Sequence, residues 1–366
     1  MKNKFLIILI ISIFSCKSNK SVDLDLDNKI IIPKTYVAYK ISNPIDIDGK
    51  EDESDWEKAI FSDDFIDIEG FDIPKQKTNV KMLWDDKNLY VFAKLYEEHI
   101  WGDLTERDAI IFNNNDFEVF INPNDHVFSY GEIEINALGT LWDLFLNKPY
   151  RLGGKADSSW NITGIKSAVD INGTINNSND IDNYWTVELS IPLNEISKLK
   201  DPYSSDNTKA GDHWRINFSR VNWDFEFIDG KYSRKKENGK ILPEYNWVWS
   251  PQGKINMHIP ENWGYLIFSD NSLEKQFSYN TDIELEQTLY AIFREIRFGY
   301  LKELMNLNQG TKIEFKPEKL NDKTIYSTFH KTSNGFIIEV ENKTGLLKYS
   351  IDQSGLINRN NSNFIK

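Results

Sequence analysis

Cysteine and clustered basic residues are scarce in this sequence of 366 residues, and each shortage excludes a class of protein. Cys16 is the only cysteine, so no disulfide within the chain can hold the fold and apolar burial must do so. The formal net charge is −13, and no basic block interrupts it. Nucleic acid and anionic membrane surfaces are therefore poor partners for this chain, and we expect no nucleic-acid binding.

Familiar catalytic signatures are also missing. The sequence has no G-x-S-x-G, no H-E-x-x-H and no phosphate-binding loop. Two carboxylates, Glu118 and Glu134, have the residue types of a glycosidase pair, but any acidic sheet offers such a pair. The histidines show no metal-ligand spacing; they are His99, His126, His213, His258 and His330. We therefore expect that the protein is not an enzyme.

Long apolar runs are absent except near the N-terminus, where the pattern is that of an export signal. Lys2 and Lys4 precede a ten-residue stretch, 5–14, in which only Ser12 is polar. This stretch is too short to span a bilayer as a stable helix but suits the core of a signal peptide. We predict that residues 1–15 are removed on export.

Residues 13–16, at the end of this stretch, resemble the bacterial lipobox, which places a small residue before a lipidated cysteine. Cys16 stands at the cleavage point, so we predict that it carries the lipid. Residues 16–35 are rich in Asp, Ser and Asn and are expected to form a flexible tether. The chain is thus expected in the cell envelope, anchored to the outer membrane on its periplasmic face or at the cell surface.

Residues 36–269 show mainly the two-residue period of β-strands. Val80, Met82 and Trp84 share one face, and an Asp-Asp-Lys-Asn turn leads to Leu89 and Val91, which indicates a hairpin. Many short strands separated by turn residues predict an all-β domain, an antiparallel β-sandwich. Further strands are expected at 116–121, 131–136, 139–146, 184–191, 214–222 and 263–268.

Residues 270–366 have a different pattern, which predicts a small α+β appendix. Thr281 and Glu284 form a capping box, and apolar residues at helical spacing predict a helix that runs to about Leu304. Three strand-like segments follow, at 324–330, 335–341 and 346–351. The sequence assigns no function to this appendix.

Several segments of the larger domain resemble proteins of the carbohydrate-binding module family 9-like group, which are common as lipoproteins of Bacteroidetes-type bacteria. The likeness is carried by their order and spacing over about 230 residues. The segments are Ile47-Asp48-Gly49 with Trp56, residues 80–91, residues 115–121, residues 132–136, residues 214–220, and residues 249–251 with 260–264.

This resemblance implies a β-sandwich of the family 9 and DOMON type, structural calcium in loops, and a slot for the end of a sugar chain between two tryptophans. The matching tryptophan positions fall on Asn113 and Met257, and the sugar-contacting arginine position falls on Glu134. The neighbouring glutamate and asparagine positions match Glu118 and Asn136. The slot is therefore altered in this chain.

The two-residue period of the strands predicts which polar side chains share a surface. It also separates the tryptophans expected in the core from those that are free to stack on a sugar. Glu118 and Glu134 alternate with apolar residues, as do Arg215 and Asn217, so these polar side chains and Asn136 are expected on one surface that binds sugar hydroxyl groups. Aromatic side chains that would replace the missing rings are Trp101, Phe112, Trp223 and Trp247. Trp56, Trp84, Trp185 and Trp214 are in phase with apolar residues and are expected in the core.

The sequence leads to one main function and leaves alternatives open. We expect a non-catalytic lipoprotein whose sandwich binds a glycan or the end of an oligosaccharide. Loss of both stacking tryptophans also allows a domain that docks a protein partner in the envelope, a sandwich associated with glycoside hydrolysis, or a haem site at Met257 and His258. Acidic loops, with Asp46 and Asp48 as the candidate ligands, allow structural calcium.

Overall fold

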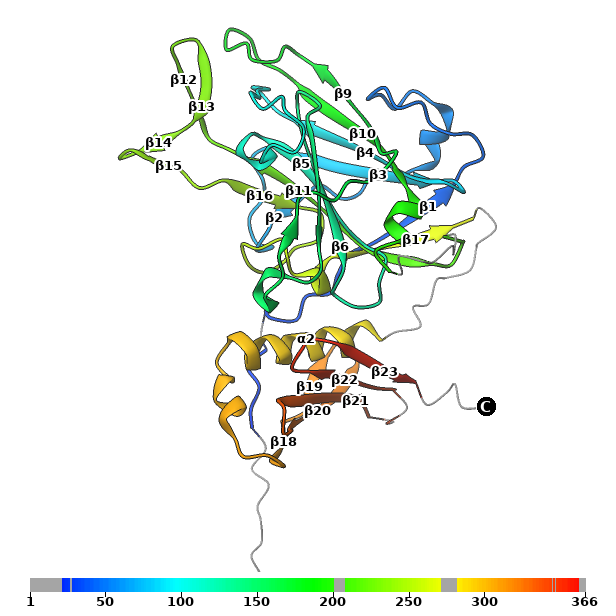
Figure 1. Ribbon diagram of the computed structural model, residues 1–366, viewed down its shortest axis with the longest axis vertical. Coiled ribbons are helices and arrows are strands. Elements are labelled where there is room, and N and C mark those ends of the chain that lie inside the picture. The colour runs from blue at the N-terminus through cyan, green and yellow to red at the C-terminus, as the bar shows by residue number, and fades with distance from the viewer. Residues whose placement is uncertain are drawn as a thin grey trace, which may run out of the picture.

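The computed structural model describes residues 22–26, 28–200, 208–270, 282–343, 345 and 347–361. Two units, each with its own hydrophobic core, follow one another along the chain (Figure 1). The predicted signal peptide and Cys16 lie outside the described residues. Within the described part of the chain, no helix is both long and apolar enough to cross a membrane.

The larger unit is built on one long, curled sheet of thirteen strands. Its main path is β8-β7-β6-β5-β11-β17-β1-β3-β4-β10-β9, and β16 and β2 extend it beside β11. The strands are β1 (Thr35–Lys40), β2 (Ile66–Asp67), β3 (Thr78–Trp84), β4 (Asn88–Tyr96), β5 (Asp116–Asn122), β6 (Tyr130–Asn136), β7 (Leu141–Leu146), β8 (Ala156–Asp157), β9 (Lys166–Asn172), β10 (Tyr184–Pro192), β11 (His213–Asn222), β16 (Tyr245–Val248) and β17 (Gly264–Ser269).

The curled sheet packs against itself as a sandwich. Ile133 of β6 and Leu189 of β10 come from opposite ends of the path and share one buried core. The tryptophans predicted for the core, Trp56, Trp84, Trp185 and Trp214, are all buried. Pairing is antiparallel except where β1 lies parallel to β17 and to β3. The prediction of a mainly antiparallel β-sandwich is therefore confirmed.

Short elements decorate the sandwich. Two small hairpins, β12 (Phe225–Ile228) with β13 (Lys231–Arg234) and β14 (Lys236–Glu237) with β15 (Lys240–Ile241), form an arm that extends from it (Figure 1). The short helices are η1 (Ser54–Lys58), η2 (Ile111–Asn113), η3 (Tyr150–Leu152), α1 (Leu193–Ser197) and η4 (Pro260–Asn262).

The smaller unit places the helix α2 (Ile283–Phe298) against a second sheet (Figure 1). This sheet has the order β18-β20-β21-β22-β23, with β19 beside β20. A 3-10 helix, η5 (Lys302–Asn306), follows α2, so the predicted single helix to Leu304 is interrupted after Phe298. The strands are β18 (Lys312–Glu314), β19 (Glu318–Leu320), β20 (Lys323–Lys331), β21 (Phe336–Asn342), β22 (Leu347–Asp352) and β23 (Ile357–Asn361).

The start of α2 differs from the predicted capping box. Asp282 is the N-cap, and its Oδ1 accepts a hydrogen bond of 3.2 Å from the backbone N–H of Leu285. Thr281, the predicted cap, lies outside the described residues. The aspartate satisfies a free N–H of the first turn, and its charge also suits the positive end of the helix dipole.

Part of the predicted tether packs against the smaller unit. Val22 pairs with Phe315 as an isolated parallel bridge, and Leu26 is buried in the second core. The aspartates Asp23 and Asp25 alternate with these apolar residues and face solvent. The prediction of a flexible tether over residues 16–35 is thus wrong for 22–26, because the leucines between the aspartates have a core to enter.

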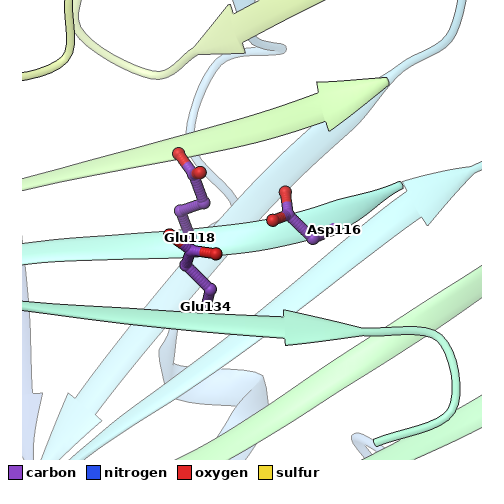
Figure 2. Close-up of side chains that lie close together, drawn as sticks. All are labelled: Asp116, Glu118 and Glu134. Atoms are coloured by element: carbon purple, nitrogen blue, oxygen red, sulfur yellow. The ribbon is translucent and has the colours of Figure 1, made fainter. Parts of the chain in front are cut away.

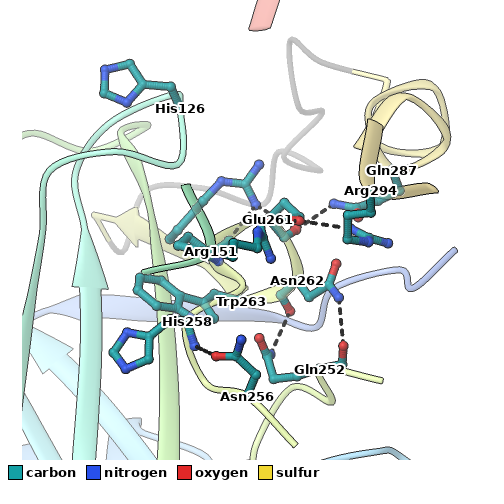
Figure 3. Close-up of polar contacts among 12 residues, drawn as sticks. His126, Arg151, Gln252, Asn256, His258, Glu261, Asn262, Trp263, Gln287 and Arg294 are labelled. Atoms are coloured by element: carbon teal, nitrogen blue, oxygen red, sulfur yellow. Dashed lines mark hydrogen bonds and ion pairs between the residues drawn. The ribbon is translucent and has the colours of Figure 1, made fainter. Parts of the chain in front are cut away.

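Buried charges join the two units at η4 (Figure 3). The carboxylate of Glu261 accepts hydrogen bonds from Arg151, at 2.6 and 2.7 Å, and from Arg294 of α2, at 2.9 Å. Gln287 of α2 donates to the backbone carbonyl of Glu261 at 2.7 Å. Burial favours the neutral acid, but the two arginines outweigh it and lower the pKa of Glu261 to about 2. The charge is therefore retained at neutral pH.

A second buried ion pair lies beside the first. Arg215 of β11 pairs with Glu286 of α2, and Arg359 of β23 donates to the same carboxylate at 2.9 Å. Arg215 had been predicted to face a sugar, but α2 covers its side chain. The alternation along the strand predicted the face of the sheet on which Arg215 lies. It could not predict that α2 packs over that face.

Candidate functional site

The candidate site lies on the outer face of β5, β6, β7 and β11. Glu118 of β5 stands opposite Glu134 of β6 on one side and Ser219 of β11 on the other. Phe117 and Val119, which alternate with Glu118, enter the sandwich core. Because directly paired residues in an antiparallel sheet share a face, the strand register brings these acidic side chains together.

Loops and helices close over this face and leave a pocket of about 360 Å³. Its floor and walls mix acidic, aromatic and amide groups. The lining residues are Ile68, Phe112, Glu118, Phe120, Glu132, Glu134, Trp142, Leu144, Tyr150, Val221, Glu244, Asn246, Ile255, Asn256, Met257 and His258. A pocket of this size holds a small ligand such as one sugar residue.

Buried carboxylates dominate the electrostatics of the pocket. Glu118, Glu132 and Glu134 are each no more than 5% exposed, and Asp116 behind them is fully buried. Single carboxylate oxygens of Asp116, Glu118 and Glu134 lie within 4.8 Å of one another (Figure 2). Glu134 Oε2 accepts a hydrogen bond of 3.0 Å from the backbone N–H of Phe112, which ties the floor to η2.

Burial raises the pKa of every member of this group. The pKa of Glu118 rises to about 7, chiefly through burial. Burial and then the negative charge of Glu118 also raise the pKa values of Asp116, Glu132 and Glu134 well above the ordinary range. Like charges this close cannot all ionise without a compensating cation, so the group retains protons near neutral pH.

Aromatic rings line the wall and the mouth of the pocket. Phe112 and Trp142 lie nearly parallel, with ring centroids 6.5 Å apart. Phe112 is 39% exposed and Tyr150 is 47% exposed. These partly exposed ring faces are suited to stack on the C–H face of a sugar.

The structure brings together some of the predicted site residues and separates the others. Phe112, Glu118, Glu134 and Met257 line the pocket. The remaining candidates do not line it; they are Trp101, Asn113, Asn136, Arg215, Asn217, Trp223 and Trp247.

The tryptophans predicted to stack on sugar are buried in packing roles. Trp101 and Trp223 are 3% and 7% exposed and share a cluster with Tyr232 of the β12–β13 hairpin. Trp223 also donates from Nε1 to the carbonyl of Phe112, so it supports the loop that carries a pocket ring. Trp247 is buried beside the guanidinium of Arg220. These rings therefore pack within the protein and do not line the pocket, contrary to the expectation that they are open to a sugar.

The predicted asparagines hold the backbone in place. Asn136 donates to the carbonyl of Leu104 and accepts from the N–H of Thr140, which fixes the turn after β6. Asn217 both donates to and accepts from the backbone of Ser250. Asn113 accepts from Arg234 at 2.7 Å. Their hydrogen-bonding capacity is used within the protein, which corrects the prediction that they face a sugar.

Sequence reasoning missed several residues of the pocket, namely Glu132, Trp142, Tyr150, Glu244, Asn246 and Asn256. A signal existed for Glu132, because it shares the phase of Glu134 on the same strand. Trp142 can be assigned to the pocket only from the strand register, which places it directly opposite Glu134. The residues from the segment 244–258 and from η3 show no periodic pattern, and only tertiary packing brings them to the pocket.

The comparison with protein families decides what kind of domain this is. Residues 47–217 match the family model described as "Carbohydrate family 9 binding domain-like". This stretch, which lies within the larger unit, is therefore similar to carbohydrate-binding domains of family 9, and the larger unit is called the family 9-like domain below. The resemblance noted in the sequence is confirmed, whereas the origin among Bacteroidetes-type lipoproteins stays a prediction. No curated protein shows significant similarity to the chain.

Solved structures with a similar fold are distant in sequence. A proposed carbohydrate-binding protein from Bacteroides uniformis has 16% identity and a TM-score of 0.47, covering 64% of this chain and 99% of that chain. A family 9 module from Caldicellulosiruptor kristjanssonii in complex with cellotriose has 15% identity and a TM-score of 0.42, covering 67% and 100%. The glucose complex of that module has 15% identity and a TM-score of 0.42, covering 68% and 100%.

The family 9-like domain does not assemble a metal group at the predicted calcium loop. Asp48 accepts from the backbone N–H of Lys50 at 2.9 Å, and its other oxygen lies 3.7 Å from Lys50 Nζ. Among the described residues, acidic and histidine side chains converge in a group of three at Asp116, Glu118 and Glu134, away from Asp46 and Asp48. Structural calcium, with Asp46 and Asp48 as candidate ligands, therefore stays a prediction.

Met257 and His258 of the same domain belong to the pocket wall. His258 Nδ1 lies 2.9 Å from the hydroxyl of Tyr130, and the ring packs edge-on against Tyr150. Burial, with the nearby positive charge of Arg151, lowers the pKa of His258 to about 4, so the imidazole is neutral at neutral pH. Its contacts give it a packing role beside the carboxylates.

Proposed function

We propose that the chain is a non-catalytic lipoprotein of the cell envelope, and that its family 9-like domain binds the end of a glycan in the pocket of Glu118, Glu134 and Phe112. The observation that carries this proposal is the pocket itself. It combines a volume suited to a single sugar, buried hydrogen-bonding groups on its floor, and partly exposed rings at its mouth.

The family 9 identity supports carbohydrate as the ligand class. The pocket departs from the expected slot because Asn113 and Met257 stand at the tryptophan positions that the resemblance implies. Phe112 and Trp142 supply ring faces at the same pocket instead. This replacement keeps stacking available although neither expected tryptophan is present.

Anchoring and the absence of catalysis are parts of the proposal that rest on the sequence. A lipid at Cys16 would hold the domain at the membrane, where it retains glycan fragments for other proteins. The close carboxylates have raised pKa values, as a glycosidase acid would. Product analysis after incubation with the bound glycan therefore belongs to the test, and release of sugar would contradict the non-catalytic part.

The direct test is a glycan array with the chain from residue 17 to 366, with and without a calcium chelator. We expect binding that depends on a free sugar end. Phe112→Ala should weaken that binding about fivefold to tenfold, because a stacking contact contributes on the order of 1 kcal/mol. Phe71→Ala is the matched control, because Phe71 is 74% exposed and does not line the pocket.

The outcomes separate glycan binding from protein docking. Loss of binding in Phe112→Ala with none in Phe71→Ala would support the proposal. Silence across plant, algal and host glycans, from a protein shown to be folded, would overturn it and favour the docking of a partner protein.

A further inference from the structure

The carboxylates of the pocket lack the cations that usually accompany buried acids. Asp116, Glu118, Glu132 and Glu134 form no ion pair with a lysine, arginine or histidine among the described residues. Arg220, whose charge acts on Asp116, is itself paired with Glu97 at 3.2 Å. Buried carboxylates are normally paired or bound to a metal, so this group requires an explanation.

An unpartnered oxygen points to a missing ligand. Asp116 Oδ1 accepts a hydrogen bond from the backbone N–H of Val221, but Oδ2 has no hydrogen-bond partner among the residues that the structure describes, although Asp116 is fully buried. In Figure 2 the Asp116 side chain extends toward Glu118 and Glu134. A buried acceptor without a donor is destabilising, and a donor brought by a ligand would remove that cost.

The geometry suits a donor that carries positive charge. Single oxygens of Asp116, Glu118 and Glu134 lie within 4.8 Å of one another. A primary ammonium group between them would donate its three N–H bonds to three carboxylate oxygens, at ordinary charge-assisted distances. A neutral hydroxyl has a single proton to donate and brings no charge to the cluster.

The rest of the pocket indicates that the cation is carried by a sugar. A divalent metal ion would also attract these oxygens, but it has no use for ring faces or for about 360 Å³ of space. Phe112 and Tyr150 stand partly exposed at the mouth, while the carboxylates are buried at the floor. A ligand with an apolar ring face at one end and an ammonium at the other matches both regions.

We infer that the pocket selects a glycan end that carries a free, protonated amine, such as an unacetylated amino sugar, and that Asp116, Glu118 and Glu134 accept the N–H bonds of the ammonium, with Glu132 beside them adding negative charge. This inference rests on the proposed glycan binding and names its substrate class. An N-acetylated sugar would be rejected, because its amide has no charge and its acetyl group would meet the carboxylates.

Calorimetric titration of the chain from residue 17 to 366 tests this selectivity. The probes are a glucosamine oligomer, its N-acetylated form and a glucose oligomer of equal length, each with calcium and with chelator. The amine form should bind about tenfold or more tightly than either other sugar, because charge-assisted hydrogen bonds replace neutral ones. The preference should be unchanged by chelation.

Two variants assign the preference to the floor of the pocket. Glu134→Gln and Glu132→Gln should each lower the affinity for the amine sugar more than the affinity for a neutral sugar, so that the preference for the amine falls. Glu237→Gln, an exposed residue on the β14–β15 hairpin, is the matched control for loss of one negative charge and should leave the preference intact. Denaturant unfolding of each variant would verify the fold, and agreement between the two floor variants guards against a defect particular to one of them.

The results distinguish failure of the inference from failure of the proposed function. Equal binding of amine and neutral sugars would overturn the inference and leave glycan binding intact. Binding of calcium that blocks the amine sugar, or sugar binding that requires calcium, would assign the cluster to a metal and also overturn it. Binding of none of the sugars by folded protein would contradict both.

Discussion

Glu118 shows how a single side chain in this pocket affects folding stability. Burial raises its pKa from 4.5 to about 7, so the folded state holds this proton more tightly than the unfolded state does. Stability from this group is fully present below about pH 4.5 and is lost as the pH rises through about 7. A pKa rise of this size corresponds to on the order of 3 kcal/mol.

We therefore expect Glu118→Gln to be more stable than the wild type near pH 8 by up to this amount, and nearly equal to it near pH 4.5. Denaturant unfolding at both pH values, without added ligand, measures the difference. A variant that is less stable than the wild type near pH 8 would show that the ionised carboxylate already has a partner in the folded protein.

Glu188 is the matched control for the effect of Glu118 on stability. Its pKa is also raised to about 7 by burial, but its carboxylate accepts hydrogen bonds from the N–H groups of Asp48 and Gly49 and from Trp56 Nε1. In a glutamine at this position, the side-chain NH₂ group would face one or more of these N–H donors whichever way the amide is oriented. Glu188→Gln should therefore lower stability at both pH values.

For single residues, the sequence predicted which side chains form a polar strand face better than it predicted which side chains are exposed to solvent. The two-residue period placed Glu118 and Glu134 on one face correctly, because alternation is a local property of strands. Trp101 and Trp223 were expected to be open to a sugar, but Tyr232, from a hairpin that follows both in the chain, packs with them in one buried cluster. Burial of a loop residue depends on such distant packing, which no local pattern contains.

The element that most affects the site is α2, because it covers the side of β11 that would otherwise extend the polar face. Glu286 of α2 is 1% exposed and pairs with both Arg215 and Arg359. Removing the charge of Glu286 would leave the buried guanidinium groups of Arg215 and Arg359 without this ion-pair partner. Loss of one partner of a buried ion pair costs about 3–5 kcal/mol.

We expect Glu286→Gln to lower the free energy of unfolding by about this amount. Glu284→Gln, two residues earlier in the same helix, should cost less than about 1 kcal/mol, because its partner Lys323 is solvent-exposed in part. Denaturant unfolding of both variants makes the comparison. Similar small losses would mean that Arg215 and Arg359 find other partners.

The existence of α2 was predictable, and its cover over β11 was not. Apolar residues at helical spacing define the helix from the sequence alone, as do the alternating strands that follow it. Its polar face also carries Glu286, Gln287 and Arg294, which are buried against the sandwich. Polar residues on a helix are ordinarily expected to face solvent. The burial of this polar face could therefore not be predicted from the sequence, because it depends on the contact between the two units.

In the whole molecule, this polar interface determines whether the two units unfold together. Glu261 with Arg151 and Arg294, and Glu286 with Arg215 and Arg359, are desolvated only while sandwich and appendix remain docked. Separation would expose each network to water and would also withdraw Val127, which lies between β5 and β6 of the sandwich, from the second core. We therefore expect a single cooperative transition for the described parts of the chain.

Two probes can follow the units separately, because all eleven tryptophans lie between residues 56 and 263. Tryptophan fluorescence thus reports the sandwich, and far-ultraviolet circular dichroism at the helical band reports mainly α2, the longest helix described. The two curves should coincide in denaturant for the wild type. In the double variant Glu261→Gln with Glu286→Gln, the helical signal should be lost first, because the interface then lacks both carboxylates. Separate transitions in the wild type would contradict the coupling, since each unit would then be stable without the buried ion pairs of the other.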